Sequence, residues 1–175
     1  MGFDVHGVKP IMNKPLDDTT IYGMIEAIPS HKDRWRMMES LTKEDKQKYW
    51  TEMDQHYDDN PGIYFRNNVW WWRPLWQFVC DNCDDLISQS SMGAGTRNDG
   101  HRIDEKTAIN IADRLFDLID DGTVDKYSAD YEKERKKLEK SDDKDAKYFA
   151  NYPFDTDNVK RFASFCKESG GFEIW

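Results

Sequence analysis

A cluster of tryptophans between residues 64 and 76 constrains this chain more than any other stretch. Four of the seven tryptophans of the protein lie within this segment. Read as a helix, the segment and its continuation form one apolar face, because apolar side chains recur three and four residues apart at Trp72, Trp76, Val79, Cys83 and Leu86. Trp70, Arg73 and Gln77 lie on another side of that helix. We therefore expect core anchors on one flank and an aromatic–guanidinium pair on the other.

The rest of the chain is predicted to be mostly helical. Helix-start residues precede apolar side chains at helical spacing at Ser30, Thr42, Asn68, Asp104 and Asp155 or Thr156. The helix after Asp104 is apolar on most of its circumference, which is typical of a central helix. The helix after Asn68 is expected to run to about Ser88. Residues 90–100 carry three glycines without apolar periodicity, which predicts a loop.

Three short segments predict β-strands, at residues 1–8, 63–66 and 172–175. They are short enough that only pairing with one another would make them stable, so we expect one small sheet. The predicted fold class is therefore α+β and mostly helical, with the helices packed on this sheet. A length of 175 residues predicts a single domain.

The charge balance limits the partners that this protein can have. The net charge of −9 argues against general binding to DNA, RNA or anionic lipid, because these need a basic patch. The sequence contains no run of about 18 apolar residues, so no membrane-spanning helix is expected. The N-terminus lacks the features of a signal peptide, and three cysteines, an odd number, fit a reducing compartment. We expect a cytoplasmic protein with no direct contact to membrane or nucleic acid.

The tryptophan segment resembles a family of short bacteriophage and prophage proteins that has no established activity. Four blocks carry the resemblance, in the same order as in the family: residues 64–76, 98–101, 152–154 and 169–174. The first block is specific to the family, and each of the others is weak by itself. The resemblance covers roughly residues 1–10 and 62–175. Residues 16–60 do not match the family pattern and are expected to be a helical insertion. The resemblance implies a phage or prophage source and a role within or against the bacterial host, without supplying a reaction.

Residues at the entry to the tryptophan helix predict a site for a small anionic ligand. Aromatic faces stack bases, and guanidinium groups grip phosphate through two hydrogen bonds. Free N–H groups at a helix start also favour an anion. The candidate ligand residues in this segment are Arg66, Asn67, Asn68, Trp70 and Arg73. The alternative interpretation is helix capping together with an ion pair between Arg73 and Asp81 or Asp84.

A second candidate segment follows the glycine-containing loop and consists of Asn98, Asp99, Gly100 and His101. An aspartate and a histidine two residues apart can act as a general acid–base pair. The alternative is a turn that carries a surface histidine. We expect Asn98, Asp99 and His101 to bind the same ligand as the first segment. This hypothesis requires four side chains to meet in one cavity near Trp70: Arg66, Arg73, Asp99 and His101.

Cys80 and Cys83 have the spacing of some zinc and redox motifs. A zinc site would need two further ligands, for which His101 and Cys166 are the obvious residues. A redox cysteine belongs at a helix N-terminus, whereas Cys80 falls in mid-helix. Buried thiols are therefore the preferred interpretation, and neither a metal site nor a cofactor is expected.

Three functions remain open at this level. The first is a binding protein for a small phosphorylated or nucleotide-like ligand, which would counter host defence signalling. The second is a protein-binding inhibitor of a host defence or nucleic-acid enzyme, acting through helices in residues 30–60 or through acidic faces that mimic DNA. The third is a small hydrolase with Asp99 and His101 as catalytic residues. A cavity that joins the two candidate segments would favour the first or third, whereas a shallow surface with exposed Trp35 or Trp50 would favour the second.

Overall fold

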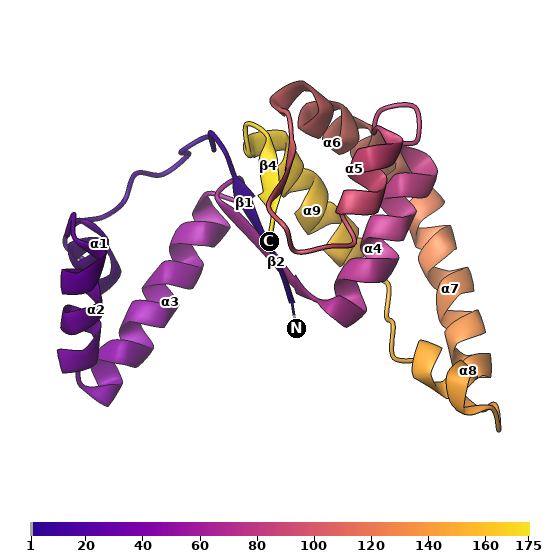
Figure 1. Cartoon of the computed structure of the whole chain (residues 1–175), viewed down its shortest axis with the longest axis horizontal. Coiled ribbons are helices and arrows are strands. Elements are labelled where there is room, and N and C mark those ends of the chain that lie inside the picture. Colours follow the sequence, from indigo (N-terminus) through magenta and orange to yellow (C-terminus); the bar gives the residue numbers. More distant parts are fainter. Residues whose placement is uncertain (1) are drawn as a thin grey trace. The chain divides into compact units, whose positions relative to one another are not determined.

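The computed structural model describes residues 2–175. These residues form two compact units. Residues 2–11 and 61–175 form the sheet unit, and Met12–Asn60 form the helical unit. Within residues 2–175 there are nine helices and one antiparallel sheet of four short strands, which confirms the predicted α+β, mostly helical class (Figure 1). In this part of the chain no helix combines the length and the apolar character needed to cross a membrane.

The sheet has the strand order β2-β1-β4-β3 and contains β1 (Gly2–Gly7), β2 (Tyr64–Asn68), β3 (His101–Ile103) and β4 (Phe172–Ile174). Val5 at its centre lies opposite both Phe65 and Ile174. The side chains of one face are buried, and those of the other are mostly polar, as alternation in an antiparallel sheet predicts. Three of the strands were predicted. The fourth, β3, was not predicted, because its three residues are too few to show alternation in the sequence.

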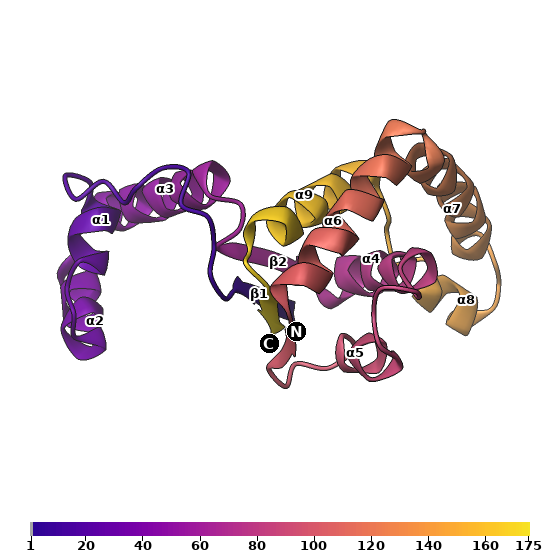
Figure 2. The ribbon, with the colours of Figure 1, turned by 90° about the horizontal axis from the view of Figure 1, so that it is seen from above.

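The core of the sheet unit lies between this sheet and three helices, α4 (Val69–Asn82), α6 (Glu105–Asp120) and α9 (Thr156–Glu168). Figure 2 shows α6 and α9 running alongside each other. Side chains of all three helices belong to one buried cluster, among them Trp72, Trp76, Val79, Ala112, Leu115 and Phe162. Trp72 is fully buried and stacks on Trp76, with ring centroids 5.4 Å apart. The spacing of the tryptophans therefore predicted the centre of the fold correctly.

Helix α4 begins as predicted and ends earlier than predicted. The Asn68 side chain caps it by accepting hydrogen bonds from the N–H groups of Trp70 and Trp71. The helix ends at Asn82 instead of about Ser88, and Asn82 itself binds a carbonyl of the last turn through its side chain. The chain turns there and leads into α5 (Gln89–Ala94), which occupies part of the predicted loop.

Helix α5 is held by tertiary contacts that local propensity does not reveal. Trp72 Nε1 donates to the carbonyl oxygen of Gly95 at 2.7 Å, and Trp76 Nε1 donates to that of Met92 at 2.9 Å. Two core tryptophans thus satisfy their only polar atoms on this short helix, which explains why a glycine-containing segment is helical. Gly95 must lack a side chain, because a Cβ there would lie 2.0 Å from the Trp76 ring.

Replacing Gly95 with alanine is therefore expected to lower the free energy of unfolding by about 1–3 kcal/mol, the range for overpacking a core. Gly93→Ala is the matched control, since a Cβ at Gly93 meets nothing within 4 Å. That change should leave stability equal or raise it by up to about 1 kcal/mol, because alanine favours a helix over glycine. Urea denaturation of both variants checks the prediction, and equal effects at the two positions would contradict the packing of α5 on Trp76.

The remaining helices of the sheet unit are α7 (Thr123–Glu139) and α8 (Lys144–Phe149), of which α8 was not predicted from the sequence. Figure 1 shows α8 following α7 and lying close to its far end. Arg135 of α7 joins the two, because its Nη1 donates to the carbonyl oxygen of Ala150 at 3.0 Å. This contact lies beside the candidate site described below.

The helical unit contains α1 (Ile21–Glu26), α2 (His31–Ser40) and α3 (Lys43–Asp59). The predicted caps at Ser30 and Thr42 are confirmed, since each side chain accepts a hydrogen bond from an N–H group three residues on. The buried cluster of this unit is small, with Tyr22, Ile25 and Tyr49 at its centre. A unit with so small a core leaves many of its apolar side chains in solvent.

Candidate functional site

The prediction that Arg66, Arg73, Asp99 and His101 meet in one cavity is wrong. Arg66 lies on β2, and His101 lies on β3, at the opposite edge of the sheet. The Arg66 Nε atom is 3.3 Å from a carboxylate oxygen of Asp4. His101 Nε2 is 3.0 Å from the Ser91 hydroxyl. Because two strands separate β2 from β3, Arg66 and His101 do not line one cavity.

The neighbouring polar residues also have partners within the fold. The buried Asn67 donates from Nδ2 to Asn158 Oδ1 at 3.0 Å. Asn98 donates to the first carbonyl of β1 at 2.6 Å. Asp99 pairs with Arg97, with 3.1 Å between Nε and Oδ2, so it does not orient the His101 ring. The serine–histidine contact at His101 therefore lacks the third group that positions the base in nucleophilic catalysis.

Trp70 and Arg73 do remain together, because both contact Tyr152. The Trp70 and Tyr152 rings meet edge to face, with centroids 4.8 Å apart. Arg73 Nη1 donates to the Tyr152 hydroxyl at 2.8 Å. Next to this pair, α4 and α7 enclose a hollow of about 350 Å³, which we call the α4–α7 groove. It is lined by Arg73, Pro74, Gln77, Tyr127, Tyr131, Glu134, Arg135, Leu138, Phe149 and Tyr152.

Two of the three charged side chains of the α4–α7 groove, Arg135 and Glu134, form ion pairs within the protein. Arg135 donates from Nε and Nη2 to the Glu132 carboxylate, at 2.6 and 2.9 Å, and Glu134 pairs with Lys137. The predicted alternative for Arg73, an ion pair with Asp81 or Asp84, does not form. Within residues 2–175 no carboxylate lies within ion-pair distance of Arg73. Arg73 is therefore the cation of the groove that remains available to another molecule.

The tyrosines of this groove could be predicted only weakly from the sequence. Tyr127, Tyr131 and Leu138 form the thin apolar stripe of α7, which alone indicates ordinary core packing. Burial raises the pKa of both Tyr127 and Tyr131, so these phenols stay neutral at physiological pH. Tyr152 reaches the groove from beyond α8, a helix that was not predicted. Only the tertiary structure brings it to Arg73.

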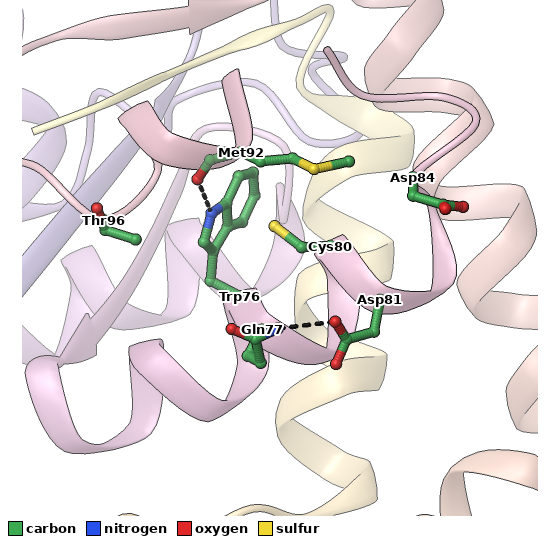
Figure 3. Close-up of a pocket in the computed structure, with 7 residues that line it drawn as sticks. All are labelled: Trp76, Gln77, Cys80, Asp81, Asp84, Met92 and Thr96. Atoms are coloured by element: carbon green, nitrogen blue, oxygen red, sulfur yellow. Dashed lines mark hydrogen bonds between the residues drawn. The ribbon is translucent and has the colours of Figure 1, made fainter. Parts of the chain in front are cut away.

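A second hollow, of about 410 Å³, lies on the side of α4 that faces α5 (Figure 3). It is lined by Trp76, Gln77, Cys80, Asp81, Asp84, Met92 and Thr96. Burial, with the nearby Asp81 carboxylate adding to it, raises the pKa of Cys80 to about 11, so its thiol is protonated at neutral pH and a poor nucleophile. Gln77 donates a hydrogen bond to Asp81 at 2.7 Å, so one of the two carboxylates that line this hollow already has a partner. Among the described residues no group of three or more His, Cys, Asp or Glu side chains could hold a metal ion.

The helical unit offers a different kind of surface. Its large exposed apolar side chains are Met12, Leu16, Met24, Trp35, Met37 and Trp50. Helix α2 buries none of its ten residues, and Trp35 on it is 62% exposed. Trp50 on α3 is 47% exposed. Met38 and Leu41, three and six residues after Trp35, pack against the small core of this unit, whereas the indole of Trp35 lies outside it.

No protein-family model, curated protein or solved structure matches the chain. The resemblance to phage and prophage proteins described above stays a prediction.

Proposed function

We propose that this protein acts by binding another protein through its helical unit. The observation that carries the proposal is the exposure of Trp35, on a helix that buries none of its own residues. The loss of the shared cavity removes the main support for the other two functions. The resemblance to phage and prophage proteins implies a role within or against a bacterial host. We therefore propose that the partner is a host protein, a defence or nucleic-acid enzyme that binding inhibits.

The exposed side chains have the chemistry of a protein interface. Tryptophan and methionine are enriched at interfaces, and tryptophan is among the residues whose truncation costs most. An indole that becomes buried in a complex removes on the order of 150–250 Å² from water. Met24 and Met37 are flexible and can adapt to the shape of a partner. Two exposed tryptophans on a unit with only a small core therefore support contact with a protein surface.

The charges on α2 indicate which surface the partner presents. Lys32, Arg34 and Arg36 lie within three residues of Trp35 in the sequence of a protein whose net charge is −9. Arg34 pairs with Glu26 at 2.6 Å and Arg36 with Asp33 at 3.2 Å, whereas the structure gives Lys32 no such partner among the described residues. A complementary partner would offer an apolar pocket for an indole with carboxylates at its edge.

The proposal is tested with the double variant Trp35→Ala/Trp50→Ala of the full chain. Tagged wild-type protein is used to capture partners from bacterial lysate, and the captured protein is then purified and its affinity measured directly. The double variant should bind it at least about 30-fold more weakly, the effect of losing one interface hot spot. Both tryptophans are exposed, so the thermal midpoint should stay close to that of the wild type.

Trp175→Ala is the matched control, because Trp175 is 50% exposed and lies in the sheet unit. It should bind the partner as the wild type does. The proposal is wrong if no protein is captured, if the double variant binds with unchanged affinity, or if Trp175→Ala weakens binding as strongly as the double variant.

A further inference from the structure

We propose that the α4–α7 groove is a binding site for a planar aromatic ligand that carries one anionic group, a carboxylate or a phosphate. The site lies wholly in the sheet unit and is independent of the protein contact proposed for the helical unit. It includes Arg73, one of the ligand residues expected from the sequence, but not the other residues predicted to bind the ligand. Its other walls come from α7 and from the chain at and after α8.

The walls of the groove suit a flat ring. Tyr127, Tyr131 and Tyr152 contribute aromatic surface, and Phe149 and Leu138 complete an apolar rim. Tyr127 and Tyr131 are themselves packed, with centroids 5.9 Å apart, so the wall is preformed. Phe149 is 58% exposed, so part of its ring is open to an incoming molecule. A hollow of about 350 Å³ lies within the roughly 300–1,000 Å³ typical of small-molecule sites.

Arg73 supplies the charge that selects an anion. A guanidinium has five N–H donors, and the hydrogen bond to Tyr152 engages only one of them at 2.8 Å. The same guanidinium lies 5.9 Å from the centroid of the Tyr152 ring, so it is held at the edge of the aromatic wall. The donors that remain can bind a carboxylate or phosphate in two-point fashion.

The other charged groups of the groove do not compete for this role. The Arg135 donors are engaged by Glu132 and by the carbonyl oxygen of Ala150, so this residue holds α7 to the end of α8. Glu134 is paired with Lys137 and carries its charge at the rim. One available cation beside three tyrosines fits a ligand with one anionic group next to an aromatic ring system.

The test compares two dyes that share a ring system and differ in charge. 8-Anilinonaphthalene-1-sulfonate is anionic, and N-phenyl-1-naphthylamine is its uncharged counterpart. In fluorescence titrations of the full chain, Arg73→Gln should weaken binding of the anionic dye by roughly ten- to hundredfold, the effect of losing a charged hydrogen bond. Binding of the neutral dye should change by less than about twofold, because the apolar wall is unaltered.

Arg161→Gln is the matched control, since Arg161 lies over the ring of Phe65, 5.5 Å from its centroid, and outside the groove. It removes the same charge and should leave both dyes unaffected. Displacement of the anionic dye by adenosine monophosphate would assign the anion as a phosphate, and displacement by 1-naphthoate would assign it as a carboxylate. The inference is overturned if Arg73→Gln leaves the anionic dye bound as before, if Arg161→Gln has the same effect, or if neither compound displaces the dye.

Discussion

Replacing Trp72 with alanine is expected to lower the free energy of unfolding by about 3–5 kcal/mol, the cost of removing a large aromatic side chain from a core. Trp72 is fully buried and stacks on Phe3 at 5.2 Å and on Trp76 at 5.4 Å. It also donates the hydrogen bond to Gly95 that holds the end of α5. The substitution would therefore remove contacts to β1, to its own helix and to α5 at once.

Urea denaturation monitored by circular dichroism measures this loss. Trp35→Ala is the matched control, because its indole is mostly exposed, and it should change stability by no more than about 0.5 kcal/mol. A loss below about 1 kcal/mol for Trp72→Ala would contradict the position of this residue at the centre of the core.

The buried face of α4 and several helix starts could be predicted from the sequence, because they depend on residues close together in the chain. The spacing of Trp72, Trp76 and Val79 identified the buried face of α4, because helical periodicity follows directly from burial on one side. Capping residues such as Asn68 and Asp104 located helix starts, since each binds N–H groups only two or three residues away. These interactions are contained within a few residues of sequence, so a single chain reveals them.

Elements held by distant contacts were missed. Helix α5 contains Gly93 and is stabilised by hydrogen bonds from α4, which no local pattern shows. The three residues of β3 pair with β4, about seventy positions later in the chain, and are too few to show alternation. Both errors come from tertiary structure that overrides weak local preference.

The predicted site failed for a related reason. Arg66 and His101 were placed together because both lie near polar loops, but strand order decides which loops meet, and it puts these residues on opposite edges. Trp70 and Arg73 stay together because they share α4. Their partner Tyr152 comes from beyond α8, a helix that was not predicted.

Replacing residues 12–60 with a short glycine linker is expected to leave a folded sheet unit. The two chain ends at this junction meet at the same residue. The N–H group of Ile11 donates to the carbonyl oxygen of Glu168 at 2.8 Å. A Cβ at Gly62 would lie 2.2 Å from that same oxygen, so Gly62 packs directly against it. A linker of a few residues can therefore join Ile11 to Pro61 without moving either strand.

The core cluster of the sheet unit draws no residue from the deleted segment. The shortened protein should unfold cooperatively, with the near-ultraviolet circular dichroism of packed aromatic rings. A shortened protein that never folds would mean that the helical unit completes the core, contrary to the division of the chain into two units.

The affinity of this shortened protein for the captured partner, measured by isothermal titration calorimetry beside the full chain, tests the proposed function most directly. The helical unit carries Trp35 and Trp50, so its removal should abolish measurable binding while the sheet unit stays folded. Binding by the shortened protein with the affinity of the full chain would contradict the proposal that the helical unit is the interaction surface.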